Sequence, residues 1–385
     1  MKRLNLLHSI CLAGSAIVPF AMATAAHAAP AGYDKIDNVV VIYAENRSFD
    51  NLYGSFPGAD GLSNATADRA RQLDRDGQPL SELPPAWGGL TAKGVSPAVT
   101  EAQSAHLANA SFAIDDPKGF AEAPSVITRD LWHRFYQEQM QIDGGKNDKF
   151  VAWADSGSLV MGHYDGSILP MWQVAKKYVM ADNFFQGAFG GSFLNHFALV
   201  CACAPYYPDA DKSPAKPTIA KVDADGTSLT VAENAPKSAL EGAPKFVSDF
   251  YKPQGNLNEH GGYADVSSGD QHLADIVSHL EKSPQWAHML VIVTYDENGG
   301  FWDHVAPPKA DRWGPGNRIP AFIISPFAKG GMVDHTQYDT TSIIRFITAR
   351  YDLPVLPGIL ARDRALRNND RPPMGDLTAA LDLTH

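Results

Sequence analysis

Residues 289–300 read MLVIVTYDENGG, and this stretch decides the fold class. Its first half, 289–294, is a continuous apolar run rich in β-branched residues, which is typical of a strand buried on both faces of a sheet. Asp296 and Glu297 follow the run directly, and an Asn-Gly-Gly sequence then favours a turn. The stretch therefore predicts a buried strand that carries two acidic side chains at its carboxyl end.

Similar apolar runs recur along the chain, with helical patterns between them. Residues 38–43 (NVVVIY) and 319–324 (IPAFII) are the longer runs, and 179–180 is a short one. Helical patterns of apolar residues occupy residues 168–178, 271–280 and 341–351. Buried strands that alternate with helices predict an α/β sandwich, with a mainly parallel central sheet flanked by helices.

Two segments interrupt this alternation. Residues 59–124 are rich in Ala, Pro, Ser and Gly, and residues 204–244 are rich in Pro, Asp and Lys. Neither segment has the apolar pattern of an independent core, and long loops of this kind are often functional. We expect both to be loop excursions from a single domain, residues 29–385, and to form the rim of the substrate site.

The first 28 residues have the pattern of a secretory signal peptide. Lys2 and Arg3 give a basic start, residues 4–23 are largely apolar, and Ala-His-Ala at 26–28 offers a cleavage site. An uncleaved membrane anchor is the alternative, which the polar residues inside the apolar run disfavour. No later stretch reaches the roughly 18 to 20 apolar residues that span a bilayer. We therefore expect a periplasmic or secreted protein without a stable membrane anchor.

The net charge argues against one class of ligand. It is −11 for the whole chain and −13 once Lys2 and Arg3 leave with the signal peptide. An acidic surface repels the phosphate backbone of nucleic acids, so DNA and RNA are not expected as ligands.

Two cysteines, Cys201 and Cys203, remain in the mature chain. Such a C-x-C pair can close a strained disulfide in an oxidising compartment. The apolar residues around the pair, 198–204, favour two buried thiols instead, and thiols are what we expect.

A second acidic cluster follows the first strand, where Glu45 and Asn46 stand next to one another. Ligands of open α/β sheets bind outside the carboxyl ends of strands, which is also where Asp296 and Glu297 are expected. Oxygen ligands that converge from two strands suit one divalent cation, either Ca²⁺, Mg²⁺ or Mn²⁺, or Zn²⁺, which also accepts carboxylates. Ordinary turn and cap residues are an equally open interpretation of the pattern alone.

Ser192 is the candidate nucleophile. It follows two glycines and precedes a helical pattern at 193–200, so backbone N–H groups at the helix start can approach a phosphate oxygen. A nearby cation would lower the pKa of its hydroxyl and activate it. Two alternatives remain open: an acyl-hydrolase elbow, which lacks its final glycine because Leu194 stands there, and a plain N-cap serine.

Three of the 13 histidines stand in suggestive surroundings. His133 belongs to a helix-like segment that ends in a Gly-Gly-Lys turn, His260 precedes two glycines, and His304 follows Asp303 after the second acidic cluster. Imidazole can both bind phosphate oxygens and protonate a leaving alkoxide near neutral pH. A lone histidine in a loop, however, is commonly a plain surface residue.

Taken together, these stretches resemble the bacterial phosphoesterase family that contains non-specific phospholipases C and exported acid phosphatases, within the alkaline-phosphatase-like superfamily. The resemblance covers most of the chain and rests on ENRSFDNLYGSFPG (45–58), HRFYQEQMQIDGGKNDKF (133–150), ADNFFQGAFGGSFLNHFALVCACAP (181–205), NEHGGY (258–263), TYDENGGFWDHVAPP (294–308) and GPGNRIPAFIISPFAKGG (314–331).

The resemblance implies a role for each candidate residue. The family's ligands to a divalent metal ion match Glu45, Asn46, Ser192, Asp296 and Glu297. The residue that the family phosphorylates matches Ser192. The family's phosphate-binding and proton-handling residues match His133, His260 and His304.

Two departures from the family bear on the substrate. Many of its phospholipases C have Gly-Pro-Thr at the nucleophile and then an Asn-Arg pair, whereas this chain has Gly191-Ser192 and Asn195-His196. The chain also stops near Leu381, without the C-terminal β-sandwich of larger members. We therefore expect a metal-dependent acid phosphatase that hydrolyses small phosphate monoesters through a phosphoserine. The alternatives are a phospholipase C that acts on phosphatidylcholine-like head groups and a non-catalytic binding protein.

Overall fold

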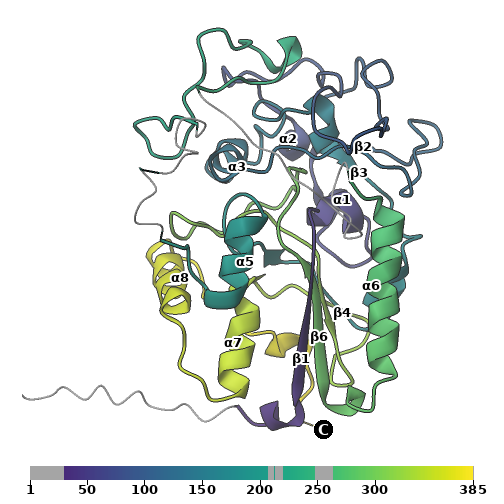
Figure 1. Cartoon of the computed structure of the whole chain (residues 1–385), viewed down its shortest axis with the longest axis vertical. Helices are drawn as coiled ribbons and strands as arrows, with labels where there is room; N and C mark the ends of the chain where they lie inside the picture. Colours follow the sequence, from purple (N-terminus) through teal and green to yellow (C-terminus); the bar gives the residue numbers. More distant parts are fainter. Residues whose placement is uncertain (1–29, 207–211, 213–219, 248–262, 385) are drawn as a thin grey trace, which may run out of the picture.

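The computed structural model describes residues 30–206, 212, 220–247 and 263–384 (Figure 1). The expected signal peptide lies outside these residues. A five-stranded sheet forms the centre of the molecule. Its strands, in spatial order, are β1 (Asn38–Ala44), β6 (Met289–Tyr295), β7 (Ala321–Ile324), β4 (Val179–Ala181) and β8 (Met332–Asp334).

Four of the five strands run in the same direction, and β7 runs against them. The apolar run at 289–294 lies in β6, every residue of which is buried. The prediction placed the start of the third strand at Ile319, whereas β7 begins at Ala321. Pro320 has no N–H to donate to a neighbouring strand, so the ladder begins after it.

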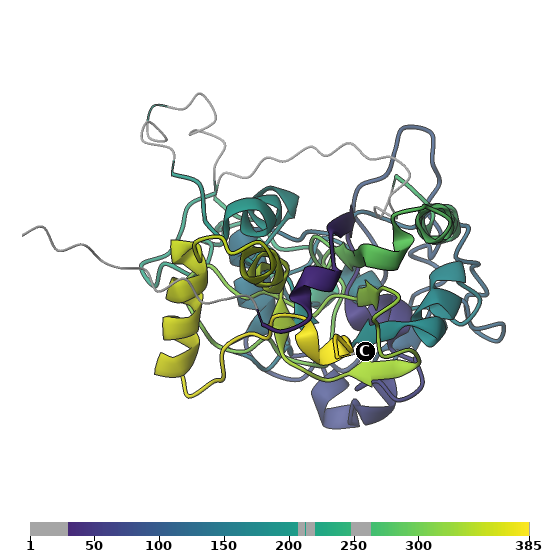
Figure 2. The ribbon, with the colours of Figure 1, turned by 90° about the horizontal axis from the view of Figure 1, so that it is seen from below.

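Helices cover both faces of the sheet, as Figures 1 and 2 show. On one face lie α5 (Ser192–Cys201), α7 (Thr341–Arg350) and α8 (Pro357–Asn368). On the other lies α6 (Val266–Glu281), against which α4 (Pro170–Lys177) packs. The α/β sandwich with a mainly parallel sheet is confirmed. None of the helices in the described part of the chain is long and apolar enough to cross a bilayer.

The other elements are short. The helices and strands are α1 (Phe49–Tyr53), α2 (Ala67–Ala70), α3 (Phe135–Ile142), β2 (Phe112–Ala113), β3 (Gly162–His163), β5 (Phe184–Phe185) and β9 (Tyr338–Asp339). The 3-10 helices are η1 (Tyr33–Lys35), η2 (Leu62–Asn64), η3 (Gly157–Met161), η6 (Ala239–Glu241), η7 (Trp286–His288) and η8 (Thr378–Ala380).

The described parts of both loop excursions lie over the end of the sheet at which β1 finishes (Figure 1). Leu83 and Ile114 of the first excursion are fully buried and belong to the same apolar core as the sheet. The Arg75 guanidinium joins the two excursions, because it donates to the carbonyl oxygens of Pro236 (2.6 Å) and Gly242 (2.7 Å). The excursions therefore form a layer above the carboxyl edge of the sheet.

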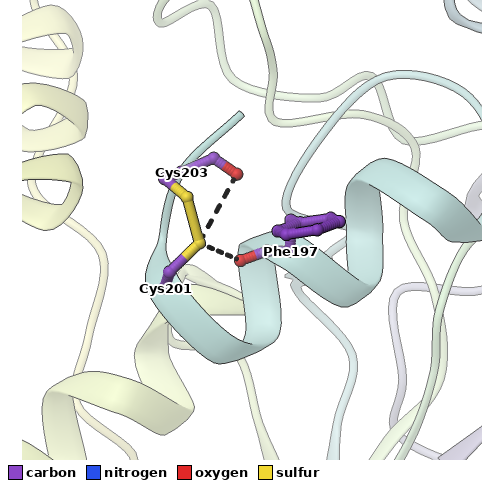
Figure 3. Close-up of a disulfide and its surroundings, with 3 residues drawn as sticks. All are labelled: Phe197, Cys201 and Cys203. Atoms are coloured by element: carbon purple, nitrogen blue, oxygen red, sulfur yellow. Dashed lines mark hydrogen bonds between the residues drawn. A yellow bond between two sulfur atoms is a disulfide. The ribbon is translucent and has the colours of Figure 1, made fainter. Parts of the chain in front are cut away.

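The expectation of two buried thiols is wrong, because Cys201 and Cys203 form a disulfide (Figure 3). Helix α5 ends at Cys201, and Ala202 takes a left-handed conformation (φ 48°) that reverses the chain. This reversal brings the two Cα atoms to 5.2 Å, within the usual range for a disulfide. The apolar neighbours do not bury the pair, since Cys203 is exposed.

Candidate active site

The carboxyl ends of β1 and β6 bring the two acidic loops together. The strands pair in register up to their last residues, so that Glu45 and Asp296 are the next residue of each. The Asp296 amide donates to the Ala44 carbonyl (2.9 Å), and the Arg47 amide donates to the Glu297 carbonyl (3.0 Å). The backbones of both loops are thus held against each other beside their acidic side chains.

Gly299 allows this close approach. Its φ is +61°, and a Cβ atom there would lie 2.3 Å from the Asn46 carbonyl oxygen. Asn46 itself has a φ of 87° and is buried. The Asn-Gly-Gly turn of the sequence therefore meets a steric requirement of the site, because no larger residue fits at position 299.

The acidic residues of the two loops lie together, and two of them are inside the protein. Asp296 and Glu297 are fully buried, and burial raises the pKa of both carboxyls well above their ordinary values. The charge of Glu45 raises the pKa of Asp296 further, and the charge of Asp296 does the same to Glu297. Negative charges that raise one another's pKa in a dry environment are stabilised by a cation placed among them.

The donor atoms fit a divalent cation. One ligand atom each from Glu45, His196 and Asp296 lie within 4.8 Å of one another. Glu297 Oε1 is buried and has no hydrogen bond to any described residue. A buried carboxylate oxygen without a donor suits a metal ligand, and carboxylate oxygens suit hard divalent ions. Glu45, His196, Asp296 and Glu297 therefore offer donor atoms for such an ion, and the buried Asn46 adjoins Glu45.

Ser192 is the first residue of α5, and Gly191 occupies the N-cap position without a side-chain cap. The plain N-cap interpretation therefore does not fit. The Ser192 side chain instead lies near the Asp296 carboxylate, where it opposes the rise in the pKa of Asp296. The candidate nucleophile thus lies against the acidic cluster, at a helix end whose free N–H groups attract anions.

His133 lies between Gly191, which precedes the candidate nucleophile, and the acidic residue Glu297, and it is 4% exposed. Its Nδ1 is 2.5 Å from the Leu131 carbonyl oxygen, and its Nε2 is 3.5 Å from Glu297 Oε1. A carbonyl oxygen only accepts hydrogen bonds, so Nδ1 carries a proton and Nε2 is the nitrogen that gains or loses one. His133 therefore presents its titrating nitrogen to the site.

The structure places His304 in a second buried cluster, with Asp50 and Asp303. His304 Nδ1 is 2.6 Å from Asp50 Oδ2, and Nε2 is 3.2 Å from Asp60 Oδ1. Burial lowers the pKa of His304, but the hydrogen bond to Asp50 and the charges of Asp50 and Asp303 together outweigh it, so the pKa is raised. Both ring nitrogens already have carboxylate partners. The third candidate, His260, lies outside the described residues.

The cluster of His304, Asp50 and Asp303 contains a positively charged side chain. Arg318 is fully buried, and its guanidinium lies 3.0 Å from both Asp303 Oδ1 and Asp50 Oδ1. These two carboxylates therefore need no metal ion. Arg318 was not predicted as a site residue, because it precedes β7 and the start of a strand was not expected at this edge. Because β7 runs against β6, its first residues lie where β1 and β6 end.

His196 was noted in the sequence only as the replacement for an arginine. It lies on the same face of α5 as Ser192, four residues along the helix. Its Nε2 is 4.0 Å from Asp296 Oδ2, and its side chain is 55% exposed. The four-residue spacing from Ser192 was the sequence signal that could have predicted His196 as a site residue, because a helix was expected to start at the nucleophile. His196 therefore joins the acidic cluster at the open side of the site.

Glu138 of α3, which the sequence analysis also missed, supports the nucleophile loop from behind. Its carboxylate accepts hydrogen bonds from the Gly190 amide, the Asn317 amide (2.9 Å) and the Gln186 side chain (2.9 Å). Gln186 in turn accepts from the amide of Asn298, in the second acidic loop (3.0 Å). Burial raises the pKa of Glu138 to about 7. Glu138 and Gln186 thus link the loop that precedes Ser192 to the loop that follows β6.

We expect Glu138→Gln to lower kcat with little change in KM. An amide in place of the carboxylate turns one acceptor into a donor that faces backbone N–H groups, so Gly190 or Asn317 loses its partner. Displacement of a reacting group by about 1 Å can cost about 100-fold in rate. The free energy of unfolding should fall by about 1 to 3 kcal/mol.

Asp270→Asn is the matched control for this variant. Asp270 is also a fully buried carboxylate, but it accepts from the Met171 amide (2.7 Å) and the Tyr53 hydroxyl (3.2 Å), on the α6 side of the sheet. It should lower stability while kcat stays near that of the wild type. A similar loss of kcat in both variants would show that Glu138 acts only through overall stability.

A cavity of about 250 Å³ opens beside Ser192. Most of its surface is apolar. Its lining residues come from the segment before α3 and from the start of α5, and they are Leu90, residues 130–135 and residues 191–194. Leu90 belongs to the first excursion, which thus contributes one wall of the site, at the position expected of a substrate rim.

Several known proteins are similar to this chain in sequence. Non-hemolytic phospholipase C of Pseudomonas aeruginosa is 24% identical over 95% of this chain and 60% of its own length. Phospholipase C B of Mycobacterium tuberculosis is 23% identical over 92% of this chain and 79% of its own length. The chain thus spans about 60% of the length of the first of these relatives.

A solved phosphonate monoester hydrolase, SpPMH from Silicibacter pomeroyi, overlaps only 22% of this chain and 17% of its own, with 20% identity and a TM-score of 0.17. The sequence profile of the Phosphoesterase family matches residues 36–249 and 244–354, which is most of the chain. The resemblance seen in the sequence is therefore confirmed, and the chain belongs to the phosphoesterase family.

Proposed function

We propose that this protein hydrolyses the phosphodiester of phospholipid head groups, as a phospholipase C, with Ser192 as the nucleophile. The observation that carries the proposal is the position of Ser192, at the start of α5 and beside the buried carboxylate of Asp296. The names of the relatives, which are phospholipases C, support the diester over the monoester that the sequence analysis preferred.

The residues of the site can perform the reaction in two steps. Ser192 Oγ forms a bond to phosphorus, its proton passes to Asp296, and the bond from phosphorus to the leaving alkoxide breaks. His133 Nε2, when protonated, donates its proton to that alkoxide. Water then attacks phosphorus and gives one proton to His133 Nε2. The bond from phosphorus to Ser192 Oγ breaks, the phosphate monoester leaves, and the proton on Asp296 returns to the serine. A divalent cation held by the acidic cluster would offset the phosphate charge and lower the pKa of the serine hydroxyl.

A phosphatase that acts on small monoesters is the second candidate. Two observations favour it: the cavity beside Ser192 is only about 250 Å³, and His196 stands where many phospholipases C of the family have arginine. A cavity of this size is smaller than the range of about 300 to 1,000 Å³ that holds a drug-sized ligand. It can hold a head group or a small phosphate ester, but not the two acyl chains of a lipid.

The rates on two soluble substrates distinguish the candidates. We expect kcat/KM for p-nitrophenylphosphorylcholine, a diester, to exceed that for p-nitrophenyl phosphate, a monoester, by at least about tenfold, or 1.4 kcal/mol of transition-state stabilisation. Both rates are measured across pH, with divalent metals added back after chelation. The reverse ratio would assign the protein to the phosphatases.

A further inference from the structure

Helix α5 exposes an apolar stripe that begins one residue after the nucleophile. Phe193 and Val200 are 69% and 70% exposed, and the Phe197 ring lies between them, 5.1 Å from the ring of Phe193. Residues separated by four and seven positions share one face of a helix. Exposed phenylalanine and valine side chains in a row are unusual on a surface that contacts only water.

The stripe continues beyond the end of α5. Val200 lines a groove of about 460 Å³ with residues of α7 and of the loop after it, including Leu353. Leu353 and Val355 are each 49% exposed. We call this surface the α5 patch, and it consists of Phe193, Phe197, Val200, Leu353 and Val355.

The charge of the α5 patch differs from that of the protein as a whole. The protein has a net charge of −11, yet residues 192–206 and 353–357 contain no Asp, Glu, Lys or Arg. An uncharged apolar patch on an acidic protein suits a surface without net charge, whereas an anionic lipid surface or a nucleic acid would be repelled. Aromatic side chains such as Phe193 and Phe197 are favoured at the boundary between head groups and acyl chains.

We propose that the α5 patch docks this protein on a zwitterionic phospholipid surface, with the site at Ser192 facing the head-group phosphates. This inference rests on the proposed phospholipase C function. Phe193 belongs both to the patch and to the wall of the cavity, so whatever covers the patch reaches the mouth of the site. The cavity holds a head group only, and docking here leaves the acyl chains in the bilayer. A second copy of this chain would instead cover that mouth.

Vesicle binding by the Ser192→Ala protein tests the inference without turnover. Full-length protein is sedimented with palmitoyl-oleoyl phosphatidylcholine vesicles, alone and with the further change Val200→Glu. We expect the parent to bind, and Val200→Glu to lower the partition coefficient at least about tenfold, because it removes one apolar contact and adds a charge.

Ile168→Glu is the matched control. Ile168 is 71% exposed, like Val200, but it precedes α4, which packs against α6 on the other face of the sheet. It should change the partition coefficient by less than about twofold, as surface changes usually do. Absence of vesicle binding by the parent, or equal losses in both variants, would overturn the inference. So would a dimer, seen by analytical ultracentrifugation, that Val200→Glu converts to monomer.

The test also separates this inference from the proposed function. With Ser192 intact, Val200→Glu should hydrolyse soluble p-nitrophenylphosphorylcholine at the wild-type rate but phosphatidylcholine vesicles more slowly. Vesicle binding without any diester hydrolysis would remove the proposed function and leave the docking surface in place. Diester hydrolysis without vesicle binding would keep the proposed function and overturn the docking surface.

Discussion

Ser192→Ala should abolish turnover while the protein keeps its fold. The Ser192 hydroxyl is half-buried at the first position of α5, and Gly191 rather than Ser192 forms the N-cap, so the helix loses no cap when the hydroxyl is removed. Removal of a nucleophile costs about 10⁶-fold in kcat in the serine protease subtilisin. We expect a loss of several orders of magnitude here, measured as kcat on p-nitrophenylphosphorylcholine.

The control is Ser267→Ala, which removes a half-buried serine from the first turn of α6, on the other face of the sheet. It should leave kcat unchanged. Rapid quenching of the wild-type reaction should also leave the transferred phosphoryl group on the peptide that contains Ser192, detectable by mass spectrometry. Retention of more than a few per cent of activity in Ser192→Ala would show that another group attacks phosphorus.

The sequence predicted the central strands because burial on both faces leaves a continuous apolar run. β1 and β6 are such runs, and the residues after them form the acidic cluster. Helix α6 begins five residues before the predicted start, because the Asp265 side chain caps it by accepting from the Ser268 amide (2.8 Å). Helix α8 was not predicted at all. It lies on the outside of α7, and its sequence has only a weak apolar stripe.

The rest of the site depends on contacts that have no local signature. Arg318 reaches the catalytic edge only because β7 runs against its neighbours, and strand direction cannot be read from an apolar run. Glu138 lies 52 residues from Gly190, the residue that it holds. The error at Cys201 and Cys203 has the same origin, because the left-handed turn at Ala202, rather than the composition around it, decides whether the sulfurs meet.

Asp296→Asn and Glu45→Gln should lose bound metal and activity together. Each substitution removes one negative charge from the acidic cluster and nearly preserves the size of the side chain. A divalent ion held by several carboxylates depends on their summed charge, so affinity should fall steeply in both variants. Elemental analysis of the purified proteins measures the metal content, and kcat on p-nitrophenylphosphorylcholine measures activity.

Thermal unfolding after chelation separates loss of the ion from loss of the fold. Without a cation, Asp296 and Glu297 are buried beside Glu45, and their charges repel one another. Asp296→Asn relieves this repulsion, so the chelated variant should unfold at the same temperature as the chelated wild type or above it. Only the wild type should gain stability when metal is restored, because an ion that binds the folded state alone stabilises it.

The control is Asp270→Asn, which changes a buried carboxylate on the other face of the sheet and should leave the metal bound. Full metal occupancy in both Asp296→Asn and Glu45→Gln would refute the assignment of these residues as ligands.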